Sequence, residues 1–164
     1  MKRAIVLIAV AAFLWALPAK AELVTIKIEA VVDDIVEAGG YLNGRIKVGD
    51  LITGIYTYDT DTPDMDWLWG SESPFVGRYH YFNPPYGISL SAGGFDFMTD
   101  PAKTNFLVEI VNNYYGDAYH LRSYNNLPLG DTTSVGNIEW ILQDPSGTAI
   151  SSADLATTAP LLDD

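Results

Sequence analysis

The 164-residue sequence contains no cysteine, which excludes a thiol nucleophile, a disulfide framework and a metal site with cysteine ligands. It also contains no nucleophile elbow, no histidine pair at zinc-ligand spacing and no glycine-rich loop followed by a helix and lysine. Apolar residues do not recur at helical spacing over three turns, which argues against long amphipathic helices. These absences leave a chain without a sequence signature of catalysis.

Basic residues are scarce. Nine lysines and arginines stand against 21 acidic residues, which gives a net charge of −12. Three of the nine (Lys2, Arg3 and Lys20) precede Glu22, so the rest of the chain carries −15. Such a surface repels nucleic acid and anionic membranes, because both depend on basic residues that meet phosphate. We therefore expect no nucleic-acid partner, and no membrane partner once the N-terminal segment is removed.

That N-terminal segment has the three parts of a signal peptide. A basic start is followed by thirteen apolar residues, Ile5–Leu17, and then by Pro18 and the small-residue motif Ala19-Lys20-Ala21. A spanning helix needs about 20 apolar residues, so the run is too short for a membrane anchor. We expect cleavage after Ala21 and a secreted or periplasmic protein, with residues 1–21 as signal peptide and 22–164 as one β domain.

The remainder alternates apolar and polar residues with a period of two, which is typical of half-buried strands. Gly93-Gly94 and Asp144-Pro145-Ser146-Gly147 are typical turn sequences between such runs. One short segment, Ser151–Ala156, is a candidate for a single helical turn. The pattern predicts an antiparallel β-sandwich of eight or nine strands, with a closed β-barrel as the alternative. The expected strands are 24–30, 51–58, 75–82, 86–92, 95–98, 106–111, 118–124 and 138–143.

The segment Val48–Asp64 reads VGDLITGIYTYDTDTPD and resembles a stretch found in exported bacterial proteins of unknown function, many of which carry a PEP-CTERM sorting signal. Tyr86–Ile88, Leu142–Ala149 and Ile150–Leu155 are similar to the same group. The sequence departs from it in its last residues, which contain no Pro-Glu-Pro and no basic cluster. The resemblance implies an envelope or extracellular β-domain associated with exopolysaccharide. It implies no active-site residue.

Two clusters are candidate binding sites. Four aspartates (Asp59, Asp61, Asp64 and Asp66) follow one expected strand, and closely spaced carboxylates on a loop are typical Ca²⁺ ligands. The spacing is not that of an EF-hand, and the alternative is a turn whose carboxylates cap their own backbone amides. Aromatic residues crowd the next twenty positions. Among them Trp67 and Trp69 are the expected exposed pair that stacks on a sugar, whereas the strand tyrosines are expected in the core.

Isolated titratable residues suggest a competing function. His80 and His120 lie in expected strands, where a histidine bonded to a neighbour is the commoner arrangement. Glu72, Glu109 and Glu139 are candidates for a carboxylate pair of the glycosidase kind, but the sequence does not set their separation. No residue is assigned as catalytic. The preferred hypothesis is a non-enzymatic, exported structural or ligand-binding module with a polysaccharide as partner and no cofactor other than Ca²⁺; the alternative is a carbohydrate hydrolase that uses paired carboxylates.

Overall fold

The computed structural model describes residues 22–36, 39–65, 73–130 and 133–160. The predicted signal peptide, Asp66, Trp67, Trp69 and Glu72 lie outside these residues. The described chain forms eight strands. They are β1 (Leu23–Val31), β2 (Leu51–Asp59), β3 (Val76–Tyr81), β4 (Gly87–Ala92), β5 (Phe95–Met98), β6 (Phe106–Val111), β7 (Asp117–Ser123) and β8 (Ile138–Asp144).

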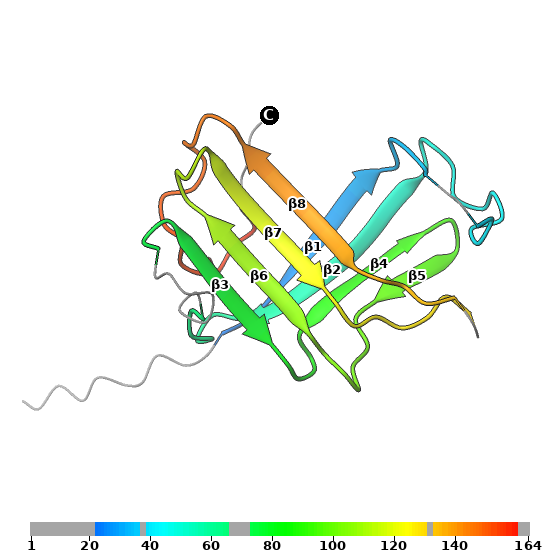
Figure 1. The fold of residues 1–164 in the computed structure, drawn as a ribbon, viewed down its shortest axis with the longest axis horizontal. Helices are drawn as coiled ribbons and strands as arrows, with labels where there is room; N and C mark the ends of the chain where they lie inside the picture. The colour runs from blue at the N-terminus through cyan, green and yellow to red at the C-terminus, as the bar shows by residue number, and fades with distance from the viewer. Residues whose placement is uncertain (1–21, 37–38, 66–72, 131–132, 161–164) are drawn as a thin grey trace, which may run out of the picture.

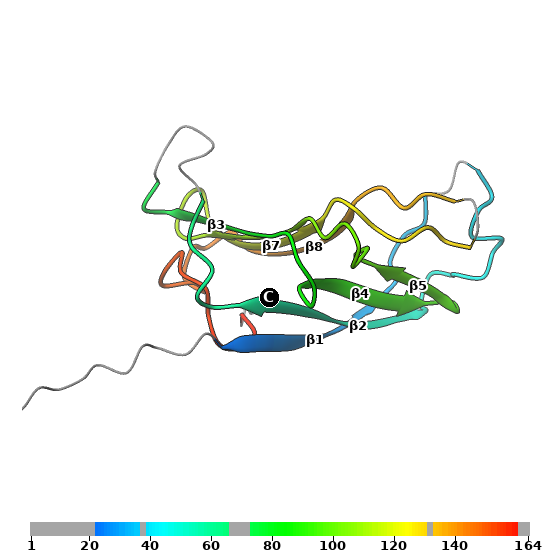
Figure 2. The same cartoon turned by 90° about the horizontal axis from the view of Figure 1, so that it is seen from below.

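The strands form two antiparallel sheets of four. Sheet A has the order β1-β2-β4-β5 and sheet B the order β3-β6-β7-β8. The sheets are stacked face to face as two layers, and their strands cross steeply instead of running side by side (Figures 1 and 2). The predicted β-sandwich is therefore confirmed with eight strands, and the closed-barrel alternative is wrong, because β3 leaves sheet A and joins a separate sheet.

Local sequence explains where the strands begin and end. In β1, Val24 and Ile28 are buried while the residues beside them are exposed, as a period of two requires. The β4–β5 hairpin turns at Gly93 and Gly94, which have φ angles of 56° and 77°. Two-residue hairpin turns of type I′ need a positive φ at both central residues, so glycine is favoured at these two positions.

The core between the layers is rich in tyrosine. Tyr56, Tyr58, Tyr79, Tyr81 and Tyr119 are each at most 5% exposed. They pack with aliphatic residues from both sheets, such as Ile28, Ile88, Val108 and Leu121. A buried tyrosine needs a partner for its hydroxyl group. Three of the five hydroxyls donate to backbone carbonyls: Tyr58 to Ala156, Tyr79 to Ala153 and Tyr81 to Asp59.

Two of those carbonyls belong to the segment that follows β8. Residues 149–160, which we call the strap, run between the layers at one end of the sandwich (Figure 2). The helical turn expected at Ser151–Ala156 is wrong: these residues form bends, and the Ala153 and Ala156 carbonyls accept bonds from the core tyrosines. In the described ranges, no helix is long and apolar enough to cross a membrane.

Candidate functional site

The outer face of sheet B holds a cluster of charged side chains. Across β3, β6 and β7, Arg78, Glu109 and His120 stand opposite one another in register. The Arg78 Nε–Glu109 Oε2 distance is 2.5 Å, and the His120 Nδ1–Glu109 Oε1 distance is 3.1 Å. The hydrogen bond from His120 and the Arg78 guanidinium lower the pKa of Glu109 to about 2, against the opposing effect of burial. Glu109 is therefore an anion at neutral pH and holds both neighbours in place.

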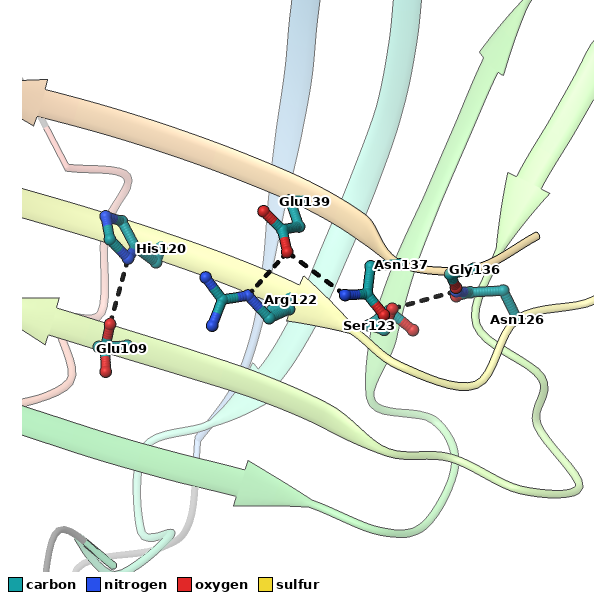
Figure 3. A network of polar contacts seen from close by, with 8 residues as sticks. All are labelled: Glu109, His120, Arg122, Ser123, Asn126, Gly136, Asn137 and Glu139. Carbon is teal, nitrogen blue, oxygen red and sulfur yellow. Dashed lines mark hydrogen bonds and ion pairs between the residues drawn. The ribbon is translucent and has the colours of Figure 1, made fainter. Parts of the chain in front are cut away.

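A second ion pair lies beside the first. Arg122 on β7 faces Glu139 on β8, with 3.0 Å between Arg122 Nε and Glu139 Oε1. Figure 3 shows this pair and the Glu109–His120 pair side by side on neighbouring strands. His80 lies on the same face and stacks on Phe82, with ring centroids 5.8 Å apart. Burial, and then the charge of Arg78, lower the pKa of His80. For His120, the expected histidine bonded to a neighbour on the strand surface is confirmed.

The loop between β6 and β7, residues 112–116, carries two exposed aromatic rings, and we call it the tyrosine hairpin. Tyr114 is 55% exposed and Tyr115 is 95% exposed. Their rings pack edge to face, with centroids 4.9 Å apart. Asn113 and Tyr115 both have left-handed φ angles, of 54° and 62°. An aromatic residue in this conformation is strained, and such strain collects at functional sites.

A hollow of about 320 Å³ lies beside the tyrosine hairpin, on the outer side of sheet B. Tyr114 and Tyr115 form one wall, and His120 and Gln143 line it from β7 and β8. His120 Nε2 is shielded from solvent and has no hydrogen-bond partner among the described residues. Aromatic rings beside hydrogen-bonding side chains suit a ligand with both an apolar face and hydroxyl groups.

Two buried aspartates hold this end of the sandwich together. Asp117 and Asp144 are register partners across β7 and β8. The Asp117 carboxylate accepts from the N–H groups of Asn113 at 2.7 Å and Ile150 at 2.6 Å, and thereby joins the tyrosine hairpin to the strap. The Asp144 carboxylate accepts from the hydroxyl and N–H of Ser146 and from the N–H groups of Thr148 and Ala149. These bonds lower the pKa of Asp144 to about 2. Both carboxylates act as loop anchors.

The described part of the predicted calcium site uses its carboxylates to fix the backbone. Asp59 Oδ1 accepts from the Asp61 N–H at 2.9 Å, and Asp59 Oδ2 accepts from the Tyr86 hydroxyl at 3.1 Å. Asp64 Oδ1 accepts from the Arg78 N–H at 2.9 Å and ties the loop to β3. Among the residues that the structure describes, no three histidine or acidic side chains are grouped to hold a metal ion. The fourth aspartate lies outside them, so the calcium site stays a prediction.

The predicted aromatic site is only partly described. Trp67 and Trp69 lie outside the described residues, so their exposure stays a prediction. Tyr79 and Tyr81 lie in the core, as expected. Sequence reasoning missed the tyrosine hairpin, because Tyr114 and Tyr115 lie between the expected strands 106–111 and 118–124, outside both candidate binding clusters. The signal that could have found it is a pair of aromatic rings placed among the turn-forming residues of a hairpin.

Sheet B carries four described carboxylates that can be compared with a catalytic pair: Asp117 and Asp144, which line the hollow, and Glu109 and Glu139 on the outer face. Each of the four is engaged with backbone amides or with a cationic neighbour. Comparison of the chain with protein-family models, curated proteins and solved structures found no match.

Proposed function

We propose that the protein is a non-enzymatic, exported binding module of the envelope or extracellular matrix that recognises a neutral polysaccharide with its tyrosine hairpin. The observation that carries the proposal is the exposure of Tyr114 and Tyr115 beside a hollow that His120 and Gln143 line. Tyrosine rings stack on the apolar faces of sugars, and the exposed Gln143 side chain, which lines the hollow, hydrogen-bonds to sugar hydroxyls. The tyrosine hairpin is firmly held, because Asp117 fixes its backbone and buried β6 and β7 flank it.

Charge supports a neutral ligand. The chain carries 21 acidic residues against nine basic ones. The arginines on the sheet B face are already paired with Glu109 and Glu139, so they offer little attraction for an acidic polymer. A neutral glycan avoids the repulsion that an anionic polysaccharide would meet.

The chemistry of the carboxylates favours binding over hydrolysis. A glycosidase needs one carboxylic acid that stays protonated near the working pH, so its pKa must be raised. The pKa values of Glu109 and Asp144 are both lowered to about 2. A group that is ionised at neutral pH has no proton to give to a leaving sugar. The hydrolase alternative therefore has less support than the binding module.

Affinity electrophoresis in gels that contain dextran, laminarin or xylan tests the proposal. We expect at least one polysaccharide to retard the wild type, and the double variant Tyr114→Ala with Tyr115→Ala to bind at least about tenfold more weakly, as loss of two central aromatic contacts does elsewhere. Tyr41→Ala is the matched control, because Tyr41 is also an exposed loop tyrosine, at 65%. Unchanged retardation of the double variant, or equal loss in the control, would contradict the proposal.

Export is a separate part of the proposal and has its own test. Its support is the basic start, the short apolar run and the small residues before Glu22. Mass spectrometry of protein recovered from the medium or periplasm of a bacterial culture should find Glu22 as the first residue. An intact chain that starts at Met1 and stays in the membrane fraction would rule out cleavage.

A further inference from the structure

The outer face of sheet A is open to solvent. Figure 2 shows sheet A as the lower layer of the sandwich, with no described segment beneath it. At the centre of this face lies a hollow of about 440 Å³, whose floor includes Ile28 and Gly54. These two residues are register partners across β1 and β2. The hollow leaves room for side chains from a second surface.

Two rows of outward side chains flank the hollow. Residues directly opposite one another in an antiparallel sheet share a face, so the strand register defines each row. The first row is Lys27, Ile55, Ser89 and Met98, and the second row is Glu29, Thr53, Ser91 and Asp96. Neither row contains an aromatic ring. This face therefore lacks the rings on which a sugar stacks, and it differs in this respect from the tyrosine hairpin.

Apolar side chains interrupt this solvent-facing surface. The solvent face of an antiparallel sheet is normally polar. Here Ile55 is exposed beside the hollow, and Val31 and Leu51, which are register partners, are exposed at the end of β1. Exposed apolar side chains that share one face are typical of protein–protein contacts.

The two charges at the centre of β1 indicate which partner fits. Lys27 and Glu29 are neighbours on the outer face, and neither forms an ion pair with any residue in the described ranges. If a second copy stacks on sheet A about a two-fold axis that runs across the strands at Ile28 and Gly54, each Lys27 lies over Glu29 of the other copy. An axis one row away would place Lys27 over Lys27, or Glu29 over Glu29, and like charges repel.

The same axis suits the uncharged positions. Stacked sheets keep their strands within about 30° of each other, so the axis exchanges rows that lie equally far on either side of it. In the strand register, it places Val31 over Thr25, Leu51 over Thr57, Ile55 over Thr53 and Asp96 over Met98 of the second copy. The aliphatic side chains of β1 and β2 therefore meet threonine methyl groups, and no two carboxylates meet.

We infer that the protein forms a two-fold dimer in which the outer faces of two copies of sheet A stack about an axis through Ile28 and Gly54. The two Lys27–Glu29 pairs set the register, and the apolar side chains around Ile55 supply the buried contact. Four short strands make a small interface, so the dimer should dissociate in the micromolar range. The inference does not depend on polysaccharide binding, because the tyrosine hairpin belongs to sheet B, the other layer of the sandwich.

Analytical ultracentrifugation of protein produced from the whole coding sequence tests for the dimer. The wild type should show a reversible monomer–dimer equilibrium. Ile55→Glu buries an unpaired charge against the second copy, so it should weaken dimerisation at least about tenfold. Ile141→Glu is the matched control, because Ile141 is equally exposed, at 43%, but lies on the outer face of sheet B. This control should dimerise like the wild type.

Exchange of the two charges tests the register. Lys27→Glu and Glu29→Lys shift the net charge in opposite directions, so a general charge effect would weaken one dimer and strengthen the other. The proposed register predicts that each substitution alone weakens the dimer, because like charges then meet across the interface. The double variant, or a mixture of the two single variants, again brings opposite charges together and should restore dimerisation.

Nuclear magnetic resonance of the wild type keeps the result decisive if a variant does not fold. The methyl signals of Ile55 and Leu51 should shift as the protein concentration rises, whereas those of Ile141 should not. The inference is overturned if the wild type stays monomeric up to millimolar concentration, if Glu29→Lys strengthens the dimer, or if the double variant does not restore it. Concentration-dependent shifts at Ile141 in place of Ile55 would overturn it as well.

Discussion

The hydroxyl of Tyr79 donates a 2.9 Å hydrogen bond to the carbonyl of Ala153, which lies 74 residues later in the chain. Tyr58 makes the equivalent bond to Ala156 from the opposite sheet. The strap is thus tied to both layers of the sandwich by core tyrosines. This arrangement explains why a segment without regular secondary structure stays in place and closes one end of the core.

Removal of either hydroxyl should loosen the strap. Tyr58→Phe and Tyr79→Phe each lose one hydrogen bond, so we expect the free energy of unfolding to fall by about 1 kcal/mol in each variant. Amide hydrogen exchange of residues 149–160 should accelerate, while exchange in β6 and β7 should not. Tyr41→Phe, which alters an exposed ring, serves as the control. Strap exchange that stays at the wild-type rate would show that these bonds do not hold it.

The strain at Tyr115 predicts a gain in stability on mutation. Its φ of 62° is unfavourable for a side chain with a β-carbon, and the ring is almost fully exposed, so its contribution to packing is small. Tyr115→Gly should raise the free energy of unfolding by up to about 1 kcal/mol, because glycine adopts positive φ without strain. Under the proposed function the same variant should bind polysaccharide more weakly. Urea denaturation measures the first effect, and a loss of stability would contradict the role assigned to the strain.

Glu109 should make stability depend on pH in the acidic range. Its folded-state pKa of about 2 lies below the ordinary value of 4.5, so its contribution is fully present above 4.5 and is lost as the pH falls toward 2. Glu109→Gln should destabilise the protein by about 2 kcal/mol at neutral pH and by much less near pH 2, because at its folded-state pKa about half of the wild-type carboxyl groups are already protonated. Urea denaturation at both pH values tests this.

Glu139→Gln is the matched control for that experiment. Glu139 is 38% exposed in its pair with Arg122, against 14% for Glu109, so solvent screens its charge more strongly. We therefore expect Glu139→Gln to lower the free energy of unfolding by less than about 1 kcal/mol at neutral pH. Equal effects of the two substitutions would show that the contact with His120 adds nothing.

Asp144 should also contribute to acid sensitivity, but through the turn after β8. Its pKa of about 2 is lowered by the hydroxyl of Ser146 and by three backbone N–H groups. Stability from these bonds is present above the ordinary pKa of 3.8 and is lost as the pH falls toward 2. Asp144→Ala should lower the melting temperature at neutral pH more than Asp96→Ala, which removes a carboxylate that accepts from one serine hydroxyl. If the melting temperatures of Asp144→Ala and Asp96→Ala still differ by as much near pH 2, the charge of Asp144 is not the cause of the difference.

The aspartates after β2 can be tested for calcium. The bonds of Asp59 to the Asp61 N–H and of Asp64 to the Arg78 N–H favour backbone capping, so we expect Ca²⁺ at constant ionic strength to leave the melting temperature unchanged. A bound ion at a hundred times its dissociation constant would stabilise by about 2.7 kcal/mol, which raises the melting temperature by several degrees. A rise with Ca²⁺ but not Mg²⁺, absent from Asp61→Ala with Asp64→Ala, would establish the metal site.

The sequence by itself determined the strands. Alternation with a period of two is a local property, so Val24, Ile26 and Ile28 predict β1 without knowledge of its partner, and Gly93-Gly94 predicts the β4–β5 turn. The Asx turn at Asp59 could also be predicted, because its donor is only two residues away. Each of these features depends on neighbours in the chain.

Tertiary structure alone decided the rest. No local pattern indicates that β3 joins sheet B and not sheet A. Nor does any local pattern indicate that the carbonyls of Ala153 and Ala156 accept hydrogen bonds from Tyr79 and Tyr58 instead of from amides within a helical turn. The burial of Tyr119 and the exposure of Tyr115, four residues earlier, likewise follow from the packing of the layers and the strap. The physical reason is that hydrogen-bond partners and burial are set by residues tens of positions away, whereas propensity and periodicity act over only a few.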